Sequence, residues 1–545
     1  MVSMRHKTVI IGGGLAGLAS AVELAAATGD GASVTLVERN PHLGGKMNVL
    51  SERGFTFDMG PTIITLPQVL RGILTRAGRR PEDYVNLVRL DPQWRCFFDD
   101  GAVIDLRENV EAMAAAMDRQ FPGTGAGAGY RKFIDFSRRM YGLSEKVFFY
   151  KDLGSVADMM RLSPLGDPAL LRDVIGMRMH STVGGTVHQM IPEPHLRQLC
   201  EHFQQYVGSS PFLAPAILSL IAAAQVDHGC WYPMGGTRMV ARALERVARE
   251  LNVNVITGVG VRRIIQSGGR ATGLELEDGR NLSADSIISN CDVQRTMRDL
   301  LGTTPALSRQ KKIAGDYTPA CSGVVLYLGL DRQYDQLAHH CFLFSRDSQA
   351  EFNDIYHAGI PARDPTLYLA VPSRSDPAQA PPGGEALYVL IHTPYLRPGQ
   401  KWEGPGGLME QYRPVVIEKL KNCGAASMPD IEKHIVVERH LHPDLIDRMY
   451  NAEGGAIYGL ASHGRLKGGF KPRNRSKVLP NLYLAGGSAN PGPGVPMVLM
   501  SGVTAARSLC EDLGVTPRPL SAVDGAVWAD RPSPVVRPRA ASVNA

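Results

Sequence analysis

Thr8-Val9-Ile10-Ile11-Gly12-Gly13-Gly14-Leu15-Ala16-Gly17-Leu18-Ala19-Ser20-Ala21 is the stretch that decides the fold of this chain. A strand rich in β-branched residues runs into a glycine turn, and an alanine-rich helix follows. Gly12 permits the tight turn, Gly14 lets the backbone approach a pyrophosphate, and Gly17 lets the helix pack closely on the strand. The unpaired N–H groups at the helix start then face the phosphates. The stretch predicts a Rossmann-like dinucleotide-binding unit.

A second apolar strand, Ser33-Val34-Thr35-Leu36-Val37, ends on Glu38, which lies 21 positions after Gly17. A carboxylate at this distance accepts a hydrogen bond from a ribose 2′-OH and would repel a 2′-phosphate. The ligand that we expect is therefore FAD or NAD rather than NADP. The alternative is a glycine-rich loop without a ligand, but such a loop needs neither the second strand nor the acid.

The residues after Glu38 help to choose between the two cofactors. The segment Arg39 to Lys46 contains the glycine pair Gly44-Gly45, and Gly54 to Thr62 runs strand-like into a tight turn. Here the chain resembles the FAD-dependent amine oxidase and desaturase superfamily, in which these segments follow the first βαβ unit and reach the flavin region. The resemblance implies FAD. The common form has Arg in place of Lys46, a departure that keeps the charge but loses the planar guanidinium.

The last part of the chain is the most specific. Leu482-Tyr483-Leu484 is typical of a buried strand, and a rigid loop rich in glycine and proline, Gly486 to Gly494, leads from it into a helix. Such a loop has few conformations to lose, and the N–H groups at the helix start can meet the electron-rich end of a flavin. A purely structural turn would not need a second strand-to-helix crossing flanked by glycines.

Together with Trp231 to Gly236, Gly455 to Gly459 and Phe470 to Ser476, this loop resembles the bacterial-type phytoene desaturase (carotenoid desaturase) family of FAD-dependent oxidoreductases, over about residues 7 to 512. The resemblance implies a desaturase that introduces double bonds into a linear carotenoid precursor in carotenoid biosynthesis. The precursor is phytoene-like, diapo-C30 or a modified carotene. Because members of the family work attached to membranes, the resemblance also implies a lipid-soluble polyene and a membrane surface as partners.

Two departures leave the substrate open. Many members have His before the Pro-Gly of the final loop, where this chain has Asn490, so any chemical role of that His is absent. The ending Pro-Met-Val-Leu-Met-Ser-Gly, residues 496–502, is closer to branches that act on modified or C30 carotenoids.

Two other functions compete with the desaturase. The shared nucleotide-binding unit is compatible with an FAD-dependent amine oxidase, and a non-catalytic polyene-binding flavoprotein would keep FAD only as structure. An amine oxidase needs an aromatic cage near the flavin and often a covalent cysteine late in the chain. Cys510 follows the final loop on the next helix and is badly placed for that bond.

The residues expected at the site fall into two groups. Asp227 and His228 are the candidates for a catalytic base, with a structural pair as the alternative. We expect no metal ligand. The cofactor-binding residues that we predict are Gly12, Gly14, Leu15, Ala16, Gly17, Glu38, Arg39, Gly44, Gly45, Lys46, Gly60, Pro61, Thr62, Val261, Gly486, Gly487, Gly494, Val495, Pro496 and Met497.

With 545 residues, the chain should form more than one domain, because a single core rarely grows past about 250–300 residues. The expected fold class is α/β. Gly123 to Gly129 is typical of a flexible joint. The predicted parts are a discontinuous Rossmann-like FAD-binding domain at 1–75, 230–302 and 477–514, a mixed α+β substrate domain at 76–122 and 303–476, a helical cap at 123–229, and a disordered tail at 515–545.

Composition limits the partners and the location. The formal net charge of +6 is small for this length, and no basic run with interleaved aromatics occurs, so we expect no nucleic acid partner. The eight cysteines are scattered without a metal-like spacing and read as reduced. Met1 to Lys7 runs into the first strand without an apolar signal region. A cytoplasmic location, peripherally associated with the cell membrane, is expected, and the sequence does not fix the oligomeric state.

Val207 to Val226 is the most apolar segment, uncharged but interrupted by Pro211 and Pro215. Hydropathy alone favours a buried core helix over an element that dips into a membrane. Because a polyene substrate resides in the bilayer, we nevertheless expect this part of the helical cap to lie in the interface without spanning it.

Overall fold

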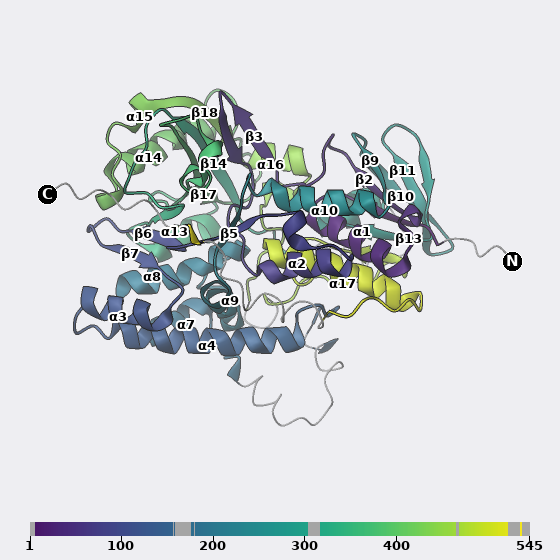
Figure 1. Cartoon of the computed structure of the whole chain (residues 1–545), viewed down its shortest axis with the longest axis horizontal. Coiled ribbons are helices and arrows are strands. Elements are labelled where there is room, and N and C mark those ends of the chain that lie inside the picture. Colours follow the sequence, from purple (N-terminus) through teal and green to yellow (C-terminus); the bar gives the residue numbers. More distant parts are fainter. Residues whose placement is uncertain are drawn as a thin grey trace.

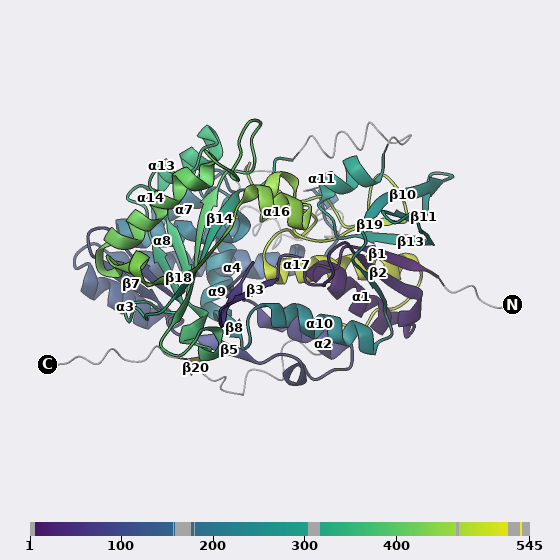
Figure 2. The same ribbon diagram turned by 90° about the horizontal axis from the view of Figure 1, so that it is seen from above.

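The computed structural model describes residues 6–155, 157–158, 176–178, 180–302, 317–464, 468–520 and 535–536. Two sheets dominate these residues, with α16 (Pro443–Tyr450) lying between them (Figures 1 and 2). Most of the tail predicted at 515–545, namely 521–534 and 537–545, lies outside the described residues.

The first sheet is parallel and, in the described part of the chain, has five strands in the order β19-β13-β1-β2-β9. Its strands come from segments far apart in the sequence and fall within the three ranges predicted for FAD binding. They are β1 (Thr8–Ile11), β2 (Val34–Glu38), β9 (Asn254–Thr257), β13 (Ser286–Ser289) and β19 (Leu482–Leu484). The division into domains itself stays a prediction.

Both faces of the parallel sheet are covered. An antiparallel sheet packs on one face, formed by β10 (Val261–Ser267), β11 (Arg270–Leu276) and β12 (Asn281–Ser283). Apolar helix faces pack on the other: α1 (Leu15–Thr28), α2 (Pro67–Arg76), α10 (Arg238–Glu250) and α17 (Val495–Asp512). Burial of α1 is continuous from Leu15 to Ala25, which explains its small, apolar side chains.

The first and last helices of this layer cross at very short range. A Cβ atom on Gly502 of α17 would lie 2.2 Å from the carbonyl oxygen of Ala16 on α1. Ser20 Oγ donates a hydrogen bond of 2.9 Å to the Gly502 carbonyl oxygen across the same contact. Only glycine allows this approach, which packs the first turn of α1 against the middle of α17.

The second sheet is mixed and, within the described residues, has the strand order β18-β14-β17-β16-β15-β6-β7, with only β15 and β6 parallel. All nine residues of β14 and of β17 are buried, because helices cover both faces. The strands are β6 (Trp94–Phe97), β7 (Val103–Leu106), β14 (Ser322–Leu330), β15 (His340–Leu343), β16 (Leu367–Ala370), β17 (Glu385–Thr393) and β18 (Ile435–Leu441).

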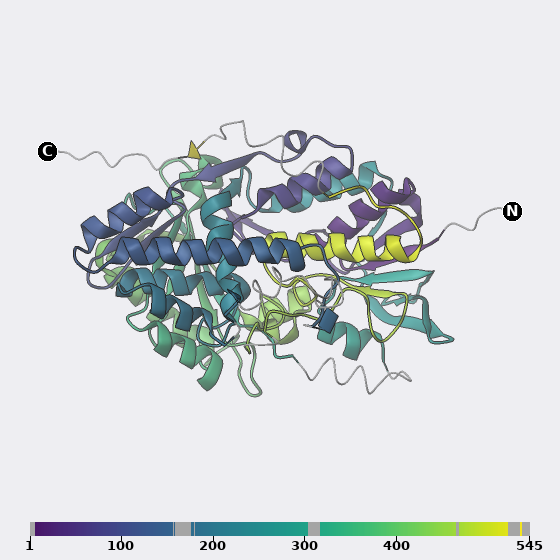
Figure 3. The same cartoon turned by 90° about the horizontal axis from the view of Figure 1, so that it is seen from below.

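Helices from two predicted parts cover this sheet. One face packs on α14 (Leu408–Asn422) and α15 (Ile431–His434). The other face packs on the helices of the 123–229 range and on α3, and Figure 3 shows the long helix α4 across this side. These helices are α3 (Val110–Gln120), α4 (Ala126–Val147), α7 (Val183–Met190), α8 (Pro194–His202) and α9 (Leu220–His228).

Shorter elements connect the two sheets. A hairpin joins β3 (Val49–Glu52) to β4 (Phe55–Asp58), and β5 (Leu87–Leu90) pairs with β8 (Trp231–Pro233) and with β20 (Val535–Val536). The remaining short helices are α11 (Val293–Arg295) and α13 (Ser348–Asn353).

The joint expected at Gly123 to Gly129 is in part wrong, because α4 begins at Ala126. Gly127 N donates a hydrogen bond of 2.8 Å to Asp118 Oδ1 of α3, and a Cβ atom at Gly127 would lie 2.4 Å from the Ala114 carbonyl oxygen. The glycines there serve a close helix crossing rather than flexibility.

No helix among the described residues is long and apolar enough to cross a membrane. Val207 to Val226 forms turns, a short 3₁₀ helix and the start of α9, and most of its residues are buried. Leu218, Leu220 and Ile221 are half-buried against the core beneath them.

The crossing of α1 and α17 predicts a sharp difference between two glycine variants. Gly502→Ala forces Cβ against the Ala16 carbonyl, so we expect a loss of about 1–3 kcal/mol of stability, a lower Tm and weaker FAD retention. The matched control is Gly142→Ala on α4, where an added Cβ meets no atom of another described element within 4 Å. That variant should gain up to about 1 kcal/mol. Equal melting temperatures for the two variants would contradict the account.

Candidate functional site

A cavity of about 400 Å³ lies between the two sheets. One end lies at the carboxyl ends of β1, β2 and β13, where open parallel sheets bind their ligands. The other end runs along the face of the mixed sheet. The cavity therefore connects a nucleotide-binding edge with a wall from a different part of the fold.

Most residues predicted for the cofactor line this cavity. They are Gly12, Gly14, Leu15, Glu38, Arg39, Gly44, Gly45, Lys46, Gly60, Pro61, Thr62, Val261, Gly486, Gly487, Gly494 and Val495. Of the described residues that we predicted, Ala16, Gly17, Pro496 and Met497 lie outside the lining. Gly17 serves packing instead, because its Cβ would lie 2.0 Å from the Gly12 carbonyl oxygen.

The nucleotide end suits an ADP-ribose. Glu38 Oε2 accepts a hydrogen bond of 2.8 Å from Gly13 N, and Oε1 accepts one of 2.8 Å from Asn40 N. These bonds fix the carboxylate and leave it acceptor capacity for a ribose hydroxyl. In the described structure, α1 has no side-chain cap at its start on Gly14, so its first N–H groups remain available to a pyrophosphate.

The start of α17 faces the same cavity. Gly494 and Val495 line it, and in the described structure this helix also lacks a side-chain cap. Its dipole places partial positive charge where the electron-rich end of a flavin is expected. Nearby, a Cβ atom on Gly486 would lie 2.7 Å from Asn290 Oδ1. The residues present therefore fit FAD: a pyrophosphate at α1 and a flavin ring toward α17.

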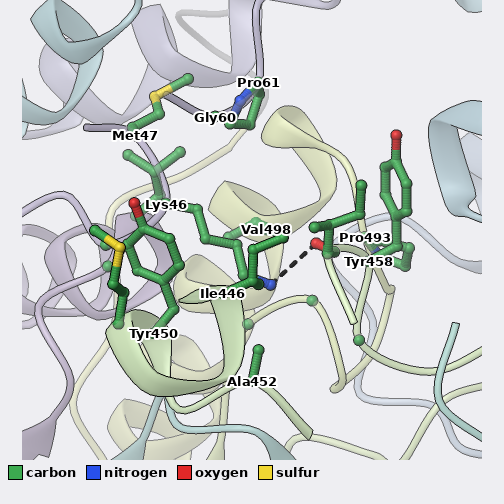
Figure 4. Close-up of a pocket in the computed structure, with 18 of the residues that line it drawn as sticks. Lys46, Met47, Gly60, Pro61, Ile446, Tyr450, Ala452, Tyr458, Pro493 and Val498 are labelled. Atoms are coloured by element: carbon green, nitrogen blue, oxygen red, sulfur yellow. Dashed lines mark hydrogen bonds between the residues drawn. The ribbon is translucent and has the colours of Figure 1, made fainter. Parts of the chain in front are cut away.

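Lys46 lies in the middle of the cavity wall, with Ile446 and Tyr450 of α16 and Val498 of α17 around it (Figure 4). Its Nζ donates hydrogen bonds of 3.0 Å to the carbonyl oxygens of Ala456 and Ile457. Burial lowers the pKa of Lys46 to about 8, and the carboxylate of Asp292 opposes that shift. The ammonium is thus held in place as a fixed donor.

The mixed-sheet side of the cavity has a different chemistry. Its lining includes Trp94, His202, Gln205, Tyr206, Val325, Phe342, Tyr368, Tyr388, Leu390 and His392. Burial lowers the pKa of His202 to about 3 and that of His392 to about 4, so both rings are neutral at neutral pH. Burial also raises the pKa values of the tyrosines. This wall, which we call the sheet wall, therefore carries no charge.

Charged groups gather at the opposite end. Among the described residues that line the cavity, the carboxylates are Glu38, Glu277 and Asp292, and the basic side chains are Arg39 and Lys46. The carboxylates and Arg39 belong to the nucleotide side, and Lys46 lies between that side and the sheet wall. The cavity is thus polar where a dinucleotide fits and uncharged along the sheet wall.

The structure places the two candidates for the catalytic base away from the cavity. Asp227 and His228 end α9 outside the cavity lining given by the described residues. Asp227 forms a salt bridge of 2.7 Å with Arg138, and His228 Nδ1 lies 3.3 Å from Gln68 Nε2. The structural alternative therefore fits this pair better.

Asn490 also has a structural place. Its Nδ2 donates to the Lys151 carbonyl at 2.6 Å and to Asn474 Oδ1 at 3.1 Å. It is buried, and among the described residues it does not line the cavity. The residue that replaces the expected His thus holds the final loop to its neighbours.

Asn290 is a cavity residue that the sequence analysis missed. It follows β13 directly, and its Nδ2 donates a hydrogen bond of 3.1 Å to the Gly12 carbonyl oxygen. A polar residue at the carboxyl end of a parallel strand was the available signal. The residues of the sheet wall are not marked by a local sequence pattern, because they come from several strands that are separate in the sequence.

Other reactive groups have no comparable site. In the part of the chain that is described, no group of three or more His, Cys, Asp or Glu side chains could hold a metal ion. All eight cysteines are free of disulfides. Cys510 is buried on α17 and does not belong to the described lining of the cavity.

Comparison with known proteins gives consistent results. Residues 15–510 match the family described as flavin containing amine oxidoreductase. A 4,4'-diapolycopene oxygenase from Methylomonas sp is 38% identical over 93% of this chain and 99% of the relative. A 4,4'-diaponeurosporene oxygenase from Staphylococcus haemolyticus is 38% identical over 91% of this chain and 96% of the relative.

Solved structures share the fold at low identity. An oxidoreductase from Methanosarcina mazei has a TM-score of 0.58 at 21% identity and covers 93% of this chain and 100% of its own. Putrescine oxidase bound to putrescine has a TM-score of 0.60 at 14% identity, over 93% and 99%. These likenesses confirm the predicted α/β fold class, and the family match confirms FAD as the cofactor.

Heating the purified protein should release intact FAD into the supernatant. The reason is that Cys510 is buried and lies outside the described lining of the cavity, so no covalent bond to the flavin is expected from it. Chromatography of the supernatant and flavin fluorescence of the pellet measure the two fractions. Flavin that stays with the denatured protein, or protection of the protein against heat by NAD alone, would contradict the account.

Proposed function

The chain belongs to the family of flavin-containing amine oxidoreductases and is an FAD-dependent oxidoreductase, and on that premise we propose that it oxidises a linear carotenoid in carotenoid biosynthesis. The names of its relatives support a diapo-type polyene, because they act on 4,4'-diapolycopene and 4,4'-diaponeurosporene. Each of those relatives aligns with more than nine-tenths of this chain.

Within that class, we propose oxygenation of the polyene, as the word oxygenase in the relatives' names indicates. Desaturation of a CH₂–CH₂ unit, the prediction from sequence, is the second candidate. Both reactions remove hydrogen from a position activated by neighbouring double bonds. FAD, when bound, accepts two electrons with a hydride from such a position.

The observation that carries the proposal is the uncharged sheet wall. Cavity-lining residues occur on six adjacent strands, from Leu441 of β18 to Trp94 of β6. At about 4.8 Å between strands, the wall extends for about 24 Å, which suits a long chain molecule. Aromatic rings and neutral imidazoles cover it, so it offers an apolar path beside the cofactor site.

An amine oxidase fits this wall less well. A protonated amine needs a carboxylate or an acceptor cluster to replace its hydration. All carboxylates among the described cavity residues lie at the nucleotide end, where they serve the cofactor. Tyr388 and Tyr458 do provide aromatic rings, but rings suit a polyene as well as an amine.

An anaerobic test separates the three functions. Mixing the FAD-loaded protein with 4,4'-diapolycopene or 4,4'-diaponeurosporene should bleach the oxidised flavin, because the sheet wall admits these hydrocarbons. Putrescine is the matched amine and should leave the flavin oxidised. Bleaching by putrescine alone would establish the amine oxidase, and polyene binding without bleaching would establish the carrier. The mass of the product from a parallel reaction under air then distinguishes oxygen gain from loss of two hydrogens.

We further propose that the protein takes its substrate from a membrane surface, because a polyene does not dissolve in water. The half-buried Leu218, Leu220 and Ile221 support an interfacial contact in the segment Val207 to Val226. This contact rests on the proposed substrate.

Leu218→Asp and Leu220→Asp should weaken flotation of the protein with liposomes, because each puts a charge where apolar contact is proposed. FAD content should stay at the level of the parent. Leu513→Asp is the matched control, since this leucine is 38% exposed at the end of α17, outside the segment. If both test variants float like the control, or lose FAD together with their fold, the contact lies elsewhere.

A further inference from the structure

Three polar side chains form a continuous hydrogen-bonded chain that starts at the cavity. Thr62 Oγ1 lies 2.5 Å from the hydroxyl of Tyr368, and that hydroxyl lies 2.8 Å from His340 Nδ1. Thr62 and Tyr368 line the cavity, whereas His340 lies behind them with 0% exposure. The three residues come from the loop after β4 and from β16 and β15, so the sheet itself aligns them.

One set of proton positions would let this chain carry a proton away from the cavity. Burial and the neighbouring ring of His339 hold the pKa of His340 well below its usual value, so the ring is neutral and carries a single proton. With the hydroxyl of Tyr368 donating to Nδ1, that proton sits on Nε2. The hydroxyl of Thr62 then donates to the oxygen of Tyr368. In this arrangement each group can pass a proton from the cavity toward His340.

Beyond His340, a second buried histidine lies close by without a hydrogen bond to it. The rings of His340 and His339 lie 4.4 Å apart between centroids, and Nε2 of each has no partner among the described residues. His339 Nδ1 lies 2.7 Å from Ser375 Oγ. His339 and Ser375 line a second, small hollow together with Asp91. Burial lowers the pKa of His339 to about 3, so this ring is also neutral.

We propose that Thr62, Tyr368 and His340 carry away the proton that the substrate loses during its oxidation. This inference rests on the proposed function, because it needs a substrate that gives up one hydride and one proton. It assigns a proton acceptor to a site for which the sequence offered only Asp227 and His228.

One C–H bond of the substrate breaks, and its electron pair leaves with the hydrogen as a hydride, which FAD would accept when bound. A neighbouring bond to hydrogen breaks and leaves its electron pair in the product as the new π bond. The released proton bonds to the oxygen of Thr62, the Thr62 hydroxyl proton moves to the oxygen of Tyr368, and the phenolic proton moves to His340 Nδ1. The proton thus ends on His340, outside the described lining of the cavity.

A second pair on the wall does not offer such a route. Tyr458 and His392 lie 3.1 Å apart between hydroxyl and Nε2, and both line the cavity. His392 itself lines the cavity, whereas His340 lies outside the described lining. A proton accepted by His392 would stay at the cavity, whereas a proton passed to His340 leaves it.

Three variants test the chain. Tyr368→Phe removes the link, and His340→Asn keeps an acceptor near the position of Nδ1 but cannot take up a proton. Tyr388→Phe is the matched control, because its hydroxyl lines the same wall without a hydrogen bond to another described residue. FAD content shows that each variant is folded. The measured quantity is the rate of flavin reduction by the carotenoid in a single anaerobic turnover, in H₂O and in D₂O.

We expect Tyr368→Phe and His340→Asn both to slow flavin reduction by about 100-fold and to change the solvent isotope effect. Tyr388→Phe should keep the isotope effect of the parent whatever its rate. If His340 has only a structural role, His340→Asn should reduce the flavin at the rate of the parent. That result would overturn the proposal. If no carotenoid reduces the flavin of the parent protein, the proposed function is wrong. If the parent reacts but the variants react as fast as the parent, the proposed proton chain is wrong.

A measurement without substrate tests the same proton positions. The ¹⁵N chemical shifts of His340, assigned by their loss in His340→Asn, should show a protonated Nε2 and an unprotonated Nδ1. Protonation on Nδ1 would make Tyr368 the acceptor of that bond and would overturn the proposed direction of transfer.

Discussion

A close contact between two helices from opposite ends of the sequence, Gly502 of α17 against the carbonyl of Ala16 on α1, is the constraint on which the site depends. The missing side chain at Gly502 lets the backbones meet, and Ser20 adds a hydrogen bond across the contact. This packing fixes α17 relative to the first turn of α1, and the starts of both helices line the same cavity. A pyrophosphate and a flavin ring can therefore be held by backbone N–H groups at the same time.

The second property of the cavity is the uneven distribution of charged side chains along it. The carboxylates and Arg39 cluster at the nucleotide end, and the sheet wall is neutral because burial suppresses the ionisation of its histidines and tyrosines. A charged wall beside an apolar polyene would lose its hydration without compensation. The wall thus favours a hydrocarbon over an ion. The hydrogen-bonded chain from Thr62 to His340 is a polar feature on this otherwise largely apolar wall.

The sequence predicted the nucleotide end far better than the sheet wall. Gly12, Gly14 and Glu38 act through local geometry, which a short motif can encode, and they line the cavity. Tyr368 and His340 meet only because two strands pair, so no local pattern marks them. Asp227 looked chemical beside His228, but a salt bridge to Arg138 explains it. The glycines near Gly127 looked flexible because sequence cannot show the helix α3 that packs against them.

The most direct test of the central claim is a crystal structure of the protein with FAD and a linear diapo-carotenoid bound. The account predicts the pyrophosphate of FAD at the start of α1, the flavin ring toward the start of α17, and the polyene along the sheet wall against Phe342, Tyr368 and Tyr388. A polyene bound outside the cavity, or a sheet wall that stays free of it while FAD is in place, would contradict the account.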